Sequence, residues 1–527
     1  MIPLTLGEIA AVTGGTLDHA AAAAVVTGPV VIDSRRAEPA ALFAALPGEH
    51  ADGHEFAAAA VAAGAVAVLA ARPVPGVPAV IVDDVTVALG ALARAVVDKL
   101  AGVTIAGITG SSGKTSTKDL AAQLAERLGP AVAPEGSFNN EIGLPLTVLR
   151  ADVSTRYLVL EMSARGAGHI AALCDIAPPR IGAVLNVGRA HAGEFGSLDA
   201  VAKAKGELPE ALPAGGTAIL NADDPRVLAM ANRTAARIVT FSVDPSAATA
   251  DVRAVGIRLD DLGRASFRLV MPAGSAPVTL RLHGAHHVPN ALAAAALAAE
   301  LGMDTPAIAG ALSAATARSR WRMELRERPD GVLVVNDAYN ANPDSTRAAI
   351  EALVHITRGG RRGFAVLGHM AELGDTEVAS HAEAGRLAAR AGVAGLIAVG
   401  ERARPVLDGA RGEAGWHGDA LAVPDAPAAV AALGNLLRPG DVVLIKASHS
   451  AGLEHIAAGL LSEDARWRPS CCLARSRWSW PCSAPDRRSP CCASASSASR
   501  SGPMARRRTW ARAARPPWAA SSSSSRR

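Results

Sequence analysis

Cysteine is scarce in this chain and is confined almost entirely to its C-terminal end. The 527 residues include six Cys, of which only Cys174 precedes residue 471. One thiol in so long a stretch excludes a disulfide framework there and is typical of a reducing compartment. We therefore expect a cytoplasmic protein.

Long apolar segments are also missing. No apolar run reaches the roughly 20 residues that a membrane-spanning helix needs. The first residues, Met1 to Thr5, lead directly into sequence that looks folded, without a charged and then apolar leader. We expect no targeting segment and no insertion into a membrane.

A basic surface is absent from most of the chain, although the whole sequence carries a net charge of +4. Residues 466–527 contain 14 Arg and one acidic residue, so 39 basic and 48 acidic residues remain elsewhere, a net charge of −9. An acidic body gives no reason to expect a nucleic-acid partner.

The last segment, residues 464–527, has an unusual composition. It holds two adjacent Cys pairs, five of the seven Trp and a run of five Ser, and it shows no helical or strand period. Adjacent cysteines without His partners have poor spacing for zinc. We expect this tail to be disordered, and we hypothesise that a frameshift near residue 463 created it. Resequencing the gene tests this, and an intact reading frame would refute it.

The most specific motif is a glycine-rich turn between a predicted strand and a predicted helix. The apolar run Val103–Ile108 predicts a buried strand, and a helical pattern covers Thr115–Arg127. Between them the chain reads T-G-S-S-G-K-T-S from Thr109 to Ser116. Strand, glycine-rich loop and helix in this order are the context of a phosphate-binding loop.

The residues of this loop suit a nucleoside triphosphate. Gly110 and Gly113 let several backbone N–H groups converge on one point at the start of a helix. Lys114 can reach the β- and γ-phosphates, and the Thr115 hydroxyl can bind Mg²⁺. The alternative is a tight turn whose glycines serve only packing, because the longer form of the motif needs a glycine where Ile108 stands.

Strand and helix patterns alternate along three successive stretches, which predicts an α/β protein of three domains. We expect a small α/β domain at residues 1–98, a central domain with a mostly parallel sheet at 99–317, and a second nucleotide-fold-like α/β domain at 318–463. The main predicted strands are Val30–Ile32, Val66–Leu69, Ala79–Val82, Tyr157–Glu161, Ile181–Asn186, Thr217–Leu220, Val332–Val335, Gly363–Leu367, Gly395–Val399 and Asp441–Lys446. The main further helices are Ala57–Ala63, Val87–Leu100, Asp199–Leu212 and Pro289–Leu301, with others beginning near Pro343, Glu377 and Ala451.

Polar side chains follow several of these strands, where ligands of α/β sheets bind. Glu161 ends its strand and suits a carboxylate ligand of Mg²⁺, although a surface or capping role is the alternative. His191 follows the next strand and is a second candidate metal ligand. Asp337, Tyr339 and Asn340 form a polar cluster after a strand of the last domain, which favours a site over a plain turn.

Two further sites are ambiguous from the residues alone. Lys203 and Lys205 lie at the predicted start of a helix, where solvated lysines are the simpler interpretation. Asn290 opens an Ala-rich helix, where its amide either contacts adenine or caps the helix.

Taken together, these motifs resemble the Mur ligase family from about residue 5 to residue 462. The resemblance rests on the recurrence, in order, of Asp33-Ser-Arg35, Leu42–Glu49, Asp52-Gly-His54, Thr109–Ser116, Phe138–Pro145, Glu161, Ala190-His191, Ala202–Glu207, Gly284–Asn290, Asn336–Pro343 and Met370–Gly374.

The resemblance implies an ATP-dependent amide ligase of peptidoglycan precursor synthesis. Within the family the motifs are most similar to the branch that adds D-Ala-D-Ala to UDP-N-acetylmuramoyl-tripeptide through an acyl phosphate. The three domains would then bind the UDP-substrate, ATP and the incoming dipeptide. We expect ATP and two Mg²⁺ ions as cofactors, those two substrates as partners, and a monomer.

The resemblance also implies residue roles. Thr115 and Glu161 would hold one Mg²⁺, and His191 and Lys205, the latter as a carbamate, a second. Lys114, His191 and Lys205 would be catalytic. The residues implied to bind ATP are Thr109, Gly110, Ser111, Ser112, Gly113, Lys114, Thr115, Ser116, Asn290, Arg322 and Asp337. Those implied to contact the other substrates are Ser34, Arg35, Asn139, Asn140, Tyr339 and Asn340.

The chain departs from the family pattern at four positions. Ser163 stands where glycine is usual, Arg189 where a small or hydroxyl residue is usual, His369 where an acid is common, and His449 where arginine is expected. The alternatives are the branch that adds the third amino acid, whose frequent D-N-P-R string does not occur here, and a homologue that binds nucleotide without catalysis. Folylpolyglutamate synthase is a more distant alternative, which the Asp33-Ser-Arg35 region fits poorly.

Overall fold

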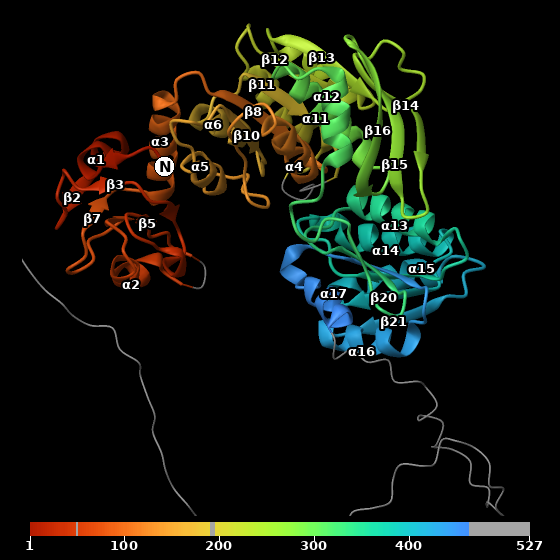
Figure 1. Ribbon diagram of the computed structural model, residues 1–527. Coiled ribbons are helices and arrows are strands. Elements are labelled where there is room, and N and C mark those ends of the chain that lie inside the picture. The colour runs from red at the N-terminus through yellow and green to blue at the C-terminus, as the bar shows by residue number, and fades with distance from the viewer. Residues whose placement is uncertain (49–50, 190–194, 463–527) are drawn as a thin grey trace, which may run out of the picture. The chain divides into compact units, whose positions relative to one another are not determined.

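The computed structural model describes residues 1–48, 51–189 and 195–462, and these residues form three successive α/β domains, each built on its own main sheet (Figure 1). The predicted α/β class and three-domain architecture are confirmed. The tail at 464–527 and our expectation of its disorder lie outside the described residues.

The N-terminal domain has a five-stranded sheet in the order β2-β7-β6-β5-β4. Strands β4 to β7 are parallel, β2 is antiparallel to β7, and β1 pairs with β3 in a separate two-stranded sheet. The strands are β1 Leu4–Thr5, β2 Thr16–Asp18, β3 Val25–Val26, β4 Val30–Val31, β5 Leu42–Ala44, β6 Ala67–Ala70 and β7 Ala79–Ile81; the helices are α1 Leu6–Thr13, α2 Ala57–Ala62 and α3 Val85–Lys99.

The central domain has a nine-stranded sheet in the order β16-β15-β14-β13-β12-β11-β8-β10-β9. The strands from β9 to β14 are parallel, and β14, β15 and β16 continue as an antiparallel meander. The strands are β8 Thr104–Thr109, β9 Ala131–Val132, β10 Tyr157–Glu161, β11 Ile181–Val184, β12 Thr217–Asn221, β13 Arg237–Ser242, β14 Val252–Leu259, β15 Arg264–Met271 and β16 Gly274–His283.

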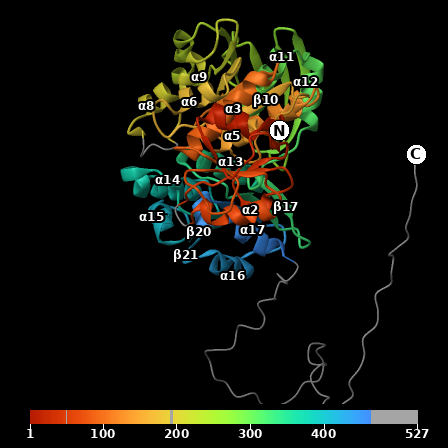
Figure 2. The same ribbon diagram turned by 90° about the vertical axis from the view of Figure 1, so that its left-hand side faces the viewer.

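Helices cover both faces of the central sheet because alternate side chains of each buried strand point to opposite faces. Within β10, Leu158 packs on one face with α5 and α6, whereas Val159 packs on the other with α4, α11 and α12. Figures 1 and 2 show helices on both faces of this sheet. The helices are α4 Lys114–Ala125, α5 Gly143–Val148, α6 His169–Ile176, α8 Leu198–Lys205, α9 Glu207–Glu210, α10 Pro225–Leu228, α11 His287–Glu300 and α12 Thr305–Ala314.

The C-terminal domain has a six-stranded sheet in the order β17-β18-β22-β19-β20-β21, parallel except for the edge strand β17. Helices α13, α14 and α15 cover one face, and α16 and α17 the other. The strands are β17 Glu324–Glu327, β18 Leu333–Asp337, β19 Gly363–Leu367, β20 Gly395–Val399, β21 Asp419–Val423 and β22 Val442–Lys446; the helices are α13 Pro343–Thr357, α14 Glu377–Arg390, α15 Pro405–Arg411, α16 Ala426–Leu436 and α17 Glu454–Leu461.

The segment that joins the central and C-terminal domains is bonded to α4, the helix that follows the glycine-rich loop. The Gln123 amide donates to the Thr316 carbonyl and accepts from its N–H, at 2.9 and 3.1 Å. Arg318 makes two hydrogen bonds to the Glu126 carboxylate. The start of the C-terminal domain is therefore held by the same helix that begins at Lys114.

Two features of the central domain differ from the sequence-based expectation. The predicted helix Asp199–Leu212 is two helices, α8 and α9, which meet at Gly206. The strands β13 to β16 were not among the predicted strands, because β14 to β16 expose one face and lack continuous apolar runs.

In the part of the chain that the structure describes, none of the helices has the length and apolar character that crossing a bilayer would require.

The crossing of α14 and α15 allows a test of this packing. A Cβ on Gly385 would lie 1.7 Å from the Val406 carbonyl oxygen. We predict that Gly385→Ala lowers the free energy of unfolding by about 1–3 kcal/mol, because backbone atoms cannot move aside. Urea unfolding followed by circular dichroism measures this.

Gly434→Ala in α16 is the matched control, since a Cβ there meets nothing within 4 Å. It should leave stability unchanged or raise it by about 0.5–1 kcal/mol through the better helix propensity of alanine. Equal effects of the two substitutions would contradict the close crossing.

Candidate active site

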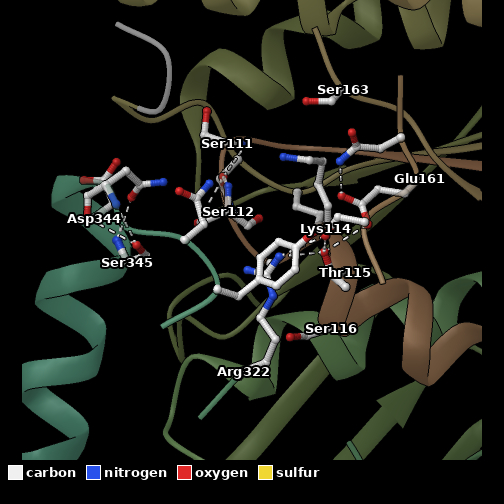
Figure 3. A pocket seen from close by; sticks show the side chains of 18 of the residues that line it. Ser111, Ser112, Lys114, Thr115, Ser116, Glu161, Ser163, Arg322, Asp344 and Ser345 are labelled. Atoms are coloured by element: carbon white, nitrogen blue, oxygen red, sulfur yellow. Dashed lines mark hydrogen bonds between the residues drawn. The ribbon is translucent and has the colours of Figure 1, made fainter. Parts of the chain in front are cut away.

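The glycine-rich loop lines a pocket of about 540 Å³ at the carboxyl ends of the central strands. Residues Ser111–Ser116 form one wall, and residues of the C-terminal domain form the opposite wall. Figure 3 shows Lys114, Thr115 and Glu161 on one side of the view and Asp344 and Ser345 on the other. Thr109 and Gly110 precede this wall at the end of β8.

Backbone geometry and close packing explain why Gly113 stands at the start of α4 and why Asn290 of α11 lies against it. Gly113 is the N-cap of α4 with φ = 82°, in the left-handed region that glycine tolerates best. A Cβ there would also lie 2.3 Å from Oδ1 of Asn290, which is 95% buried in the first turn of α11. Asn290 therefore lies against the loop and does not cap α11, whose N-cap is His286.

Asn186 organises the loop and was not among the predicted site residues. Its Oδ1 accepts the N–H groups of Ser111 and Ser112 at 3.0 and 2.9 Å, and its amide donates to the Ser112 carbonyl. Its place directly after the strand Ile181–Val184 was the available signal, since polar residues at strand ends face such pockets.

Thr115 and Glu161 form a buried pair of oxygen donors. The Thr115 hydroxyl donates to Glu161 Oε2 at 2.9 Å, and the Asn139 amide donates to Oε1 at 2.7 Å. Thr115 is 3% exposed and Glu161 1% exposed, so the interpretation of Glu161 as a surface carboxylate is wrong. A carboxylate and a hydroxyl this close match the oxygen ligands that Mg²⁺ prefers.

The two predicted catalytic lysines, Lys114 and Lys205, differ in their relation to the pocket. Lys114 donates to the Gly110 carbonyl at 2.8 Å, and burial lowers its pKa while Glu161 raises it. Lys205 ends α8 and does not line the pocket, but it is only 4% exposed. Burial, with a smaller effect of Lys114, lowers the pKa of Lys205 well below its usual value.

The interpretation of Lys205 as a solvated helix lysine is therefore wrong, although Lys203 is exposed. The helical pattern placed both lysines correctly on a helix, but they lie in the last turn of α8 and not at a helix start. Only packing distinguishes the buried side of this helix from its exposed side. Among the described residues, no hydrogen-bond or ion-pair partner contacts the Lys205 amine.

The C-terminal domain contributes Arg322 to the pocket. Its Nη2 donates to the hydroxyl oxygens of Thr115 and Ser137 at 3.0 and 3.1 Å, and its guanidinium lies 4.2 Å from the ring centroid of Tyr339. Both Trp321 and Met323, its neighbours, have positive φ values of 59° and 50°. This backbone strain lies on both sides of Arg322, whose side chain bridges the two domains.

Asp337 lies at the end of β18 and is largely occupied by protein contacts. Its carboxylate bonds Lys446 Nζ at 2.5 Å and the Met323 N–H at 3.1 Å. Lys446 is 2% exposed, and burial lowers its pKa while Asp337 raises it. Lys446 was not a predicted site residue; the available signal was its place at the end of the predicted strand Asp441–Lys446.

A second bridge joins the domains through Asp344 at the start of α13. Its Oδ2 accepts the Arg189 N–H at 3.0 Å, beside Gly188, whose carbonyl accepts the Ser111 hydroxyl. Arg189 thus joins the domains through its backbone, and the residue itself is exposed.

The remaining predicted residues are only partly brought together. Asn140 and Asn340 both lie on the pocket wall, where Asn140 Oδ1 accepts the Gly143 N–H at the start of α5 and Asn340 lies beside Ser448. Ser34 and Arg35 do not line this pocket; they lie in the N-terminal domain, where Arg35 pairs with Asp33 at 2.7 Å.

The predicted metal ligand His191 lies outside the described residues. Within residues 1–48, 51–189 and 195–462, no cluster of three or more His, Cys, Asp or Glu side chains could hold a metal. The candidate metal ligands that the structure describes are therefore Thr115, Glu161 and, if modified, Lys205.

The other departures from the family pattern also lie at the pocket. Ser163 lines it, and the ring of His449 lies 5.6 Å from those of both Trp321 and Tyr339. His369 Nε2 lies 3.0 Å from the Ser450 hydroxyl.

Comparison with known proteins decides the family. Three family profiles match in succession: "Mur ligase family, catalytic domain" at residues 29–97, "Mur ligase middle domain" at 108–298, and "Mur ligase, glutamate ligase domain" at 321–449. A Mycobacterium tuberculosis relative is 50% identical over 88% of this chain and 99% of its own length. This chain belongs to the Mur ligase family.

Relatives of this Mur ligase share one name. The M. tuberculosis relative and one from Escherichia coli, 36% identical over 87% of the chain and 99% of the relative, are each named UDP-N-acetylmuramoyl-tripeptide--D-alanyl-D-alanine ligase. A crystal structure of MurF from Acinetobacter baumannii is 30% identical, with a TM-score of 0.76 over 87% of this chain and 99% of that one. A MurF ligase from Thermotoga maritima in complex with ADP is 28% identical, with a TM-score of 0.71 over 82% and 97%.

Two adjacent histidines in the pocket wall of this Mur ligase yield a pH prediction. The rings of His286 and His287 lie 4.3 Å apart, burial lowers the pKa of His286 to about 4, and the pKa of His287 lies well below 6.5. Below pH 6.5 the unfolded chain binds protons that the folded chain does not. Stability should therefore fall as the pH drops from about 6.5 towards 4.

We predict that wild-type protein loses about 2 kcal/mol more unfolding free energy than His286→Gln between pH 7 and pH 5. Urea unfolding of both proteins at the two pH values measures the difference. Parallel losses would contradict a neutral His286 in the folded protein.

Proposed function

We propose that this Mur ligase joins D-Ala-D-Ala to UDP-N-acetylmuramoyl-tripeptide, forming an amide bond at the expense of ATP. The observation that carries the proposal is the pocket that lies between the phosphate loop and the C-terminal domain, with Lys114, Thr115 and Glu161 on one wall and Arg322 and Tyr339 on the other. The names of the relatives at 36 to 50% identity support the choice of substrates.

The proposed ATP site combines three features of the loop. The N-terminus of α4 and the N–H groups of its first turn, Lys114–Ser116, favour the negative charge of the phosphates. Lys114 supplies a positive charge that can follow the transferring phosphoryl group. Asn290 and Asp337, on either side of the pocket, are proposed nucleotide contacts.

The proposed Mg²⁺ ligands fit the ion, because Thr115 Oγ1 and Glu161 Oε2 are hard oxygen donors 2.9 Å apart. Bound Mg²⁺ would neutralise charge on the phosphates during transfer. His191 and a carbamate on Lys205 are the proposed ligands of a second ion.

The environment of Lys205 supports its carbamylation. A neutral amine nitrogen can attack CO₂, forming an N–C bond and losing one proton to give an anionic carbamate. Burial favours the neutral form of this lysine. The reaction would convert this neutral amine into an anion that a metal ion can pair with.

The proposed reaction has two steps. The terminal carboxylate of the tripeptide attacks the γ-phosphorus, forming an acyl phosphate while ADP leaves. The amine of D-Ala-D-Ala then attacks the acyl carbon, and phosphate leaves as the amide forms. Lys114 and Arg322 would stabilise charge on the phosphoryl group, and the domain bridge at Asp344 would help exclude water.

We assign the domains proposed from the sequence to the three ligands. Residues 1–98 would bind the UDP end of the acceptor through Ser34 and Arg35, and 99–317 would bind ATP, with Asn139 and Asn140 facing the acceptor. Residues 318–463 would bind the dipeptide near Tyr339 and Asn340. The protein would act in the cytoplasm as a monomer.

The experiment is a phosphate-release assay on the full chain with ATP and Mg²⁺. We expect release only when UDP-MurNAc-tripeptide and D-Ala-D-Ala are both present, with the pentapeptide product identified by mass. Chelation of Mg²⁺ should stop the reaction. Turnover with a free amino acid on UDP-MurNAc-dipeptide would instead favour the branch that adds the third residue. ATP binding without turnover would favour a non-catalytic homologue.

Lys114→Met should lower kcat by about 10²- to 10³-fold, because it removes a preorganised positive charge from the transferring phosphoryl group. Lys99→Met is the matched control: Lys99 lies on α3 and pairs with Glu8 at 2.8 Å. It should leave kcat unchanged. A Lys114→Met enzyme with wild-type kcat would contradict the assigned role.

A further inference from the structure

The end of helix α8 carries Lys205, and carbonyls of its last turn can accept hydrogen bonds from outside the helix, including that of Ala202, which also accepts the Gly206 N–H. Lys205 is its last residue, and its side chain is buried. The position of the Lys205 amine therefore depends on how the backbone of this turn is held.

Arg233, from the turn that follows α10, binds this helix end. Its Nη1 donates to the Ala202 carbonyl at 3.2 Å and its Nη2 to the Lys203 carbonyl at 2.8 Å. Its Nε donates to Glu210 Oε1, on α9, at 2.7 Å. One planar guanidinium thus joins the last carbonyls of α8 to the helix that follows it.

Gly206 makes room for this guanidinium. Its φ and ψ of −66° and −14° are ordinary helical values that any residue adopts. A Cβ at this position, however, would lie 1.8 Å from Arg233 Nη1 and 2.2 Å from its Cζ. Glycine is needed here for space and not for backbone freedom.

Glu207 holds the other side of the same turn. Its carboxylate accepts the N–H groups of Gly168, Ile170 and Ala171 at 2.6, 3.1 and 3.1 Å. These groups form the N-terminus of α6, where a negative charge is favoured. The turn at 205–207 is therefore fixed on one side by Arg233 and on the other by Glu207.

We propose that Arg233 is a positioning residue for Lys205: through the Ala202 and Lys203 carbonyls it fixes the end of α8 so that the Lys205 amine stays where its carbamate forms and pairs with a metal ion. Arg233 acts only through this backbone and contacts no substrate. The inference rests on the proposed function, in which Lys205 is carbamylated.

The main test compares Arg233→Met with Arg226→Ala. Arg226 pairs with Asp199 in the first turn of the same helix, at 3.1 Å on the exposed surface, so its removal leaves the C-terminal carbonyls of α8 untouched. Both full-length proteins are equilibrated with ¹³C-bicarbonate, Mg²⁺ and ADP, and the lysine carbamate is quantified by ¹³C NMR.

We expect Arg233→Met to lower carbamate occupancy about 10- to 100-fold at limiting bicarbonate, the usual cost of losing a residue that orients a ligand. Amide formation should become dependent on added bicarbonate, with the KM for ATP unchanged. Arg226→Ala should match wild type. The carbamate occupancy of Arg233→Lys should lie between those of wild type and Arg233→Met, since one ammonium group cannot bind both carbonyls and Glu210.

A double-mutant cycle provides the second test. Because a Cβ at 206 would displace the guanidinium, Gly206→Ala should reproduce the bicarbonate dependence of Arg233→Met, and the double variant should be no worse than Gly206→Ala alone. Additive losses would overturn the proposal, because they would mean that the two residues act independently.

The outcomes separate this inference from the function beneath it. If wild type forms the carbamate and Arg233→Met forms it to the same occupancy, the role of Arg233 is overturned and the proposed function is unaffected. A wild type with amide formation but no carbamate would overturn this inference and the Lys205 assignment together. A wild type with neither would refute the proposed function itself.

Discussion

Parallel pairing of β8 with β10 and β11 is the constraint on which the site depends. In this register Glu161 pairs with Ile108, and Val184 pairs with Thr109. Strands that run in parallel end at the same edge, so the loop after β8 and the carboxylate that ends β10 meet there. The 2.9 Å contact between Thr115 and Glu161 is a direct consequence, although 46 residues separate them in the chain.

The same edge also receives the C-terminal domain. Arg322 reaches the Thr115 hydroxyl, Asp344 accepts the Arg189 N–H, and Gln123 binds the connecting segment at Thr316. Three separate contacts thus link the phosphate-loop side to the other wall of the pocket. Movement of the C-terminal domain would have to break these contacts or move the residues on both sides of them together. The geometry around Thr115 is therefore coupled to the position of Arg322.

Prediction from the sequence succeeded where a local pattern carries the chemistry. The glycine-rich loop needs only eight consecutive residues to be recognised, and Glu161 stands at the end of an unbroken apolar strand. It failed where burial decides. Lys205 and Lys203 look alike in the sequence, yet one is buried and the other exposed. Asn186 and Lys446 escaped notice because their partners, Ser111 and Asp337, are distant in the chain.

By itself the sequence determined the family, the α/β class with three domains, and the phosphate loop, because each of these is written in short motifs and in alternating apolar periods. Only the tertiary structure decided which polar groups share the pocket and which lysine amines are buried. It alone decided that Arg233 packs over Gly206. The physical reason is that hydrogen bonds, desolvation and close packing depend on distances between atoms. For residues far apart in the chain, folding alone sets those distances.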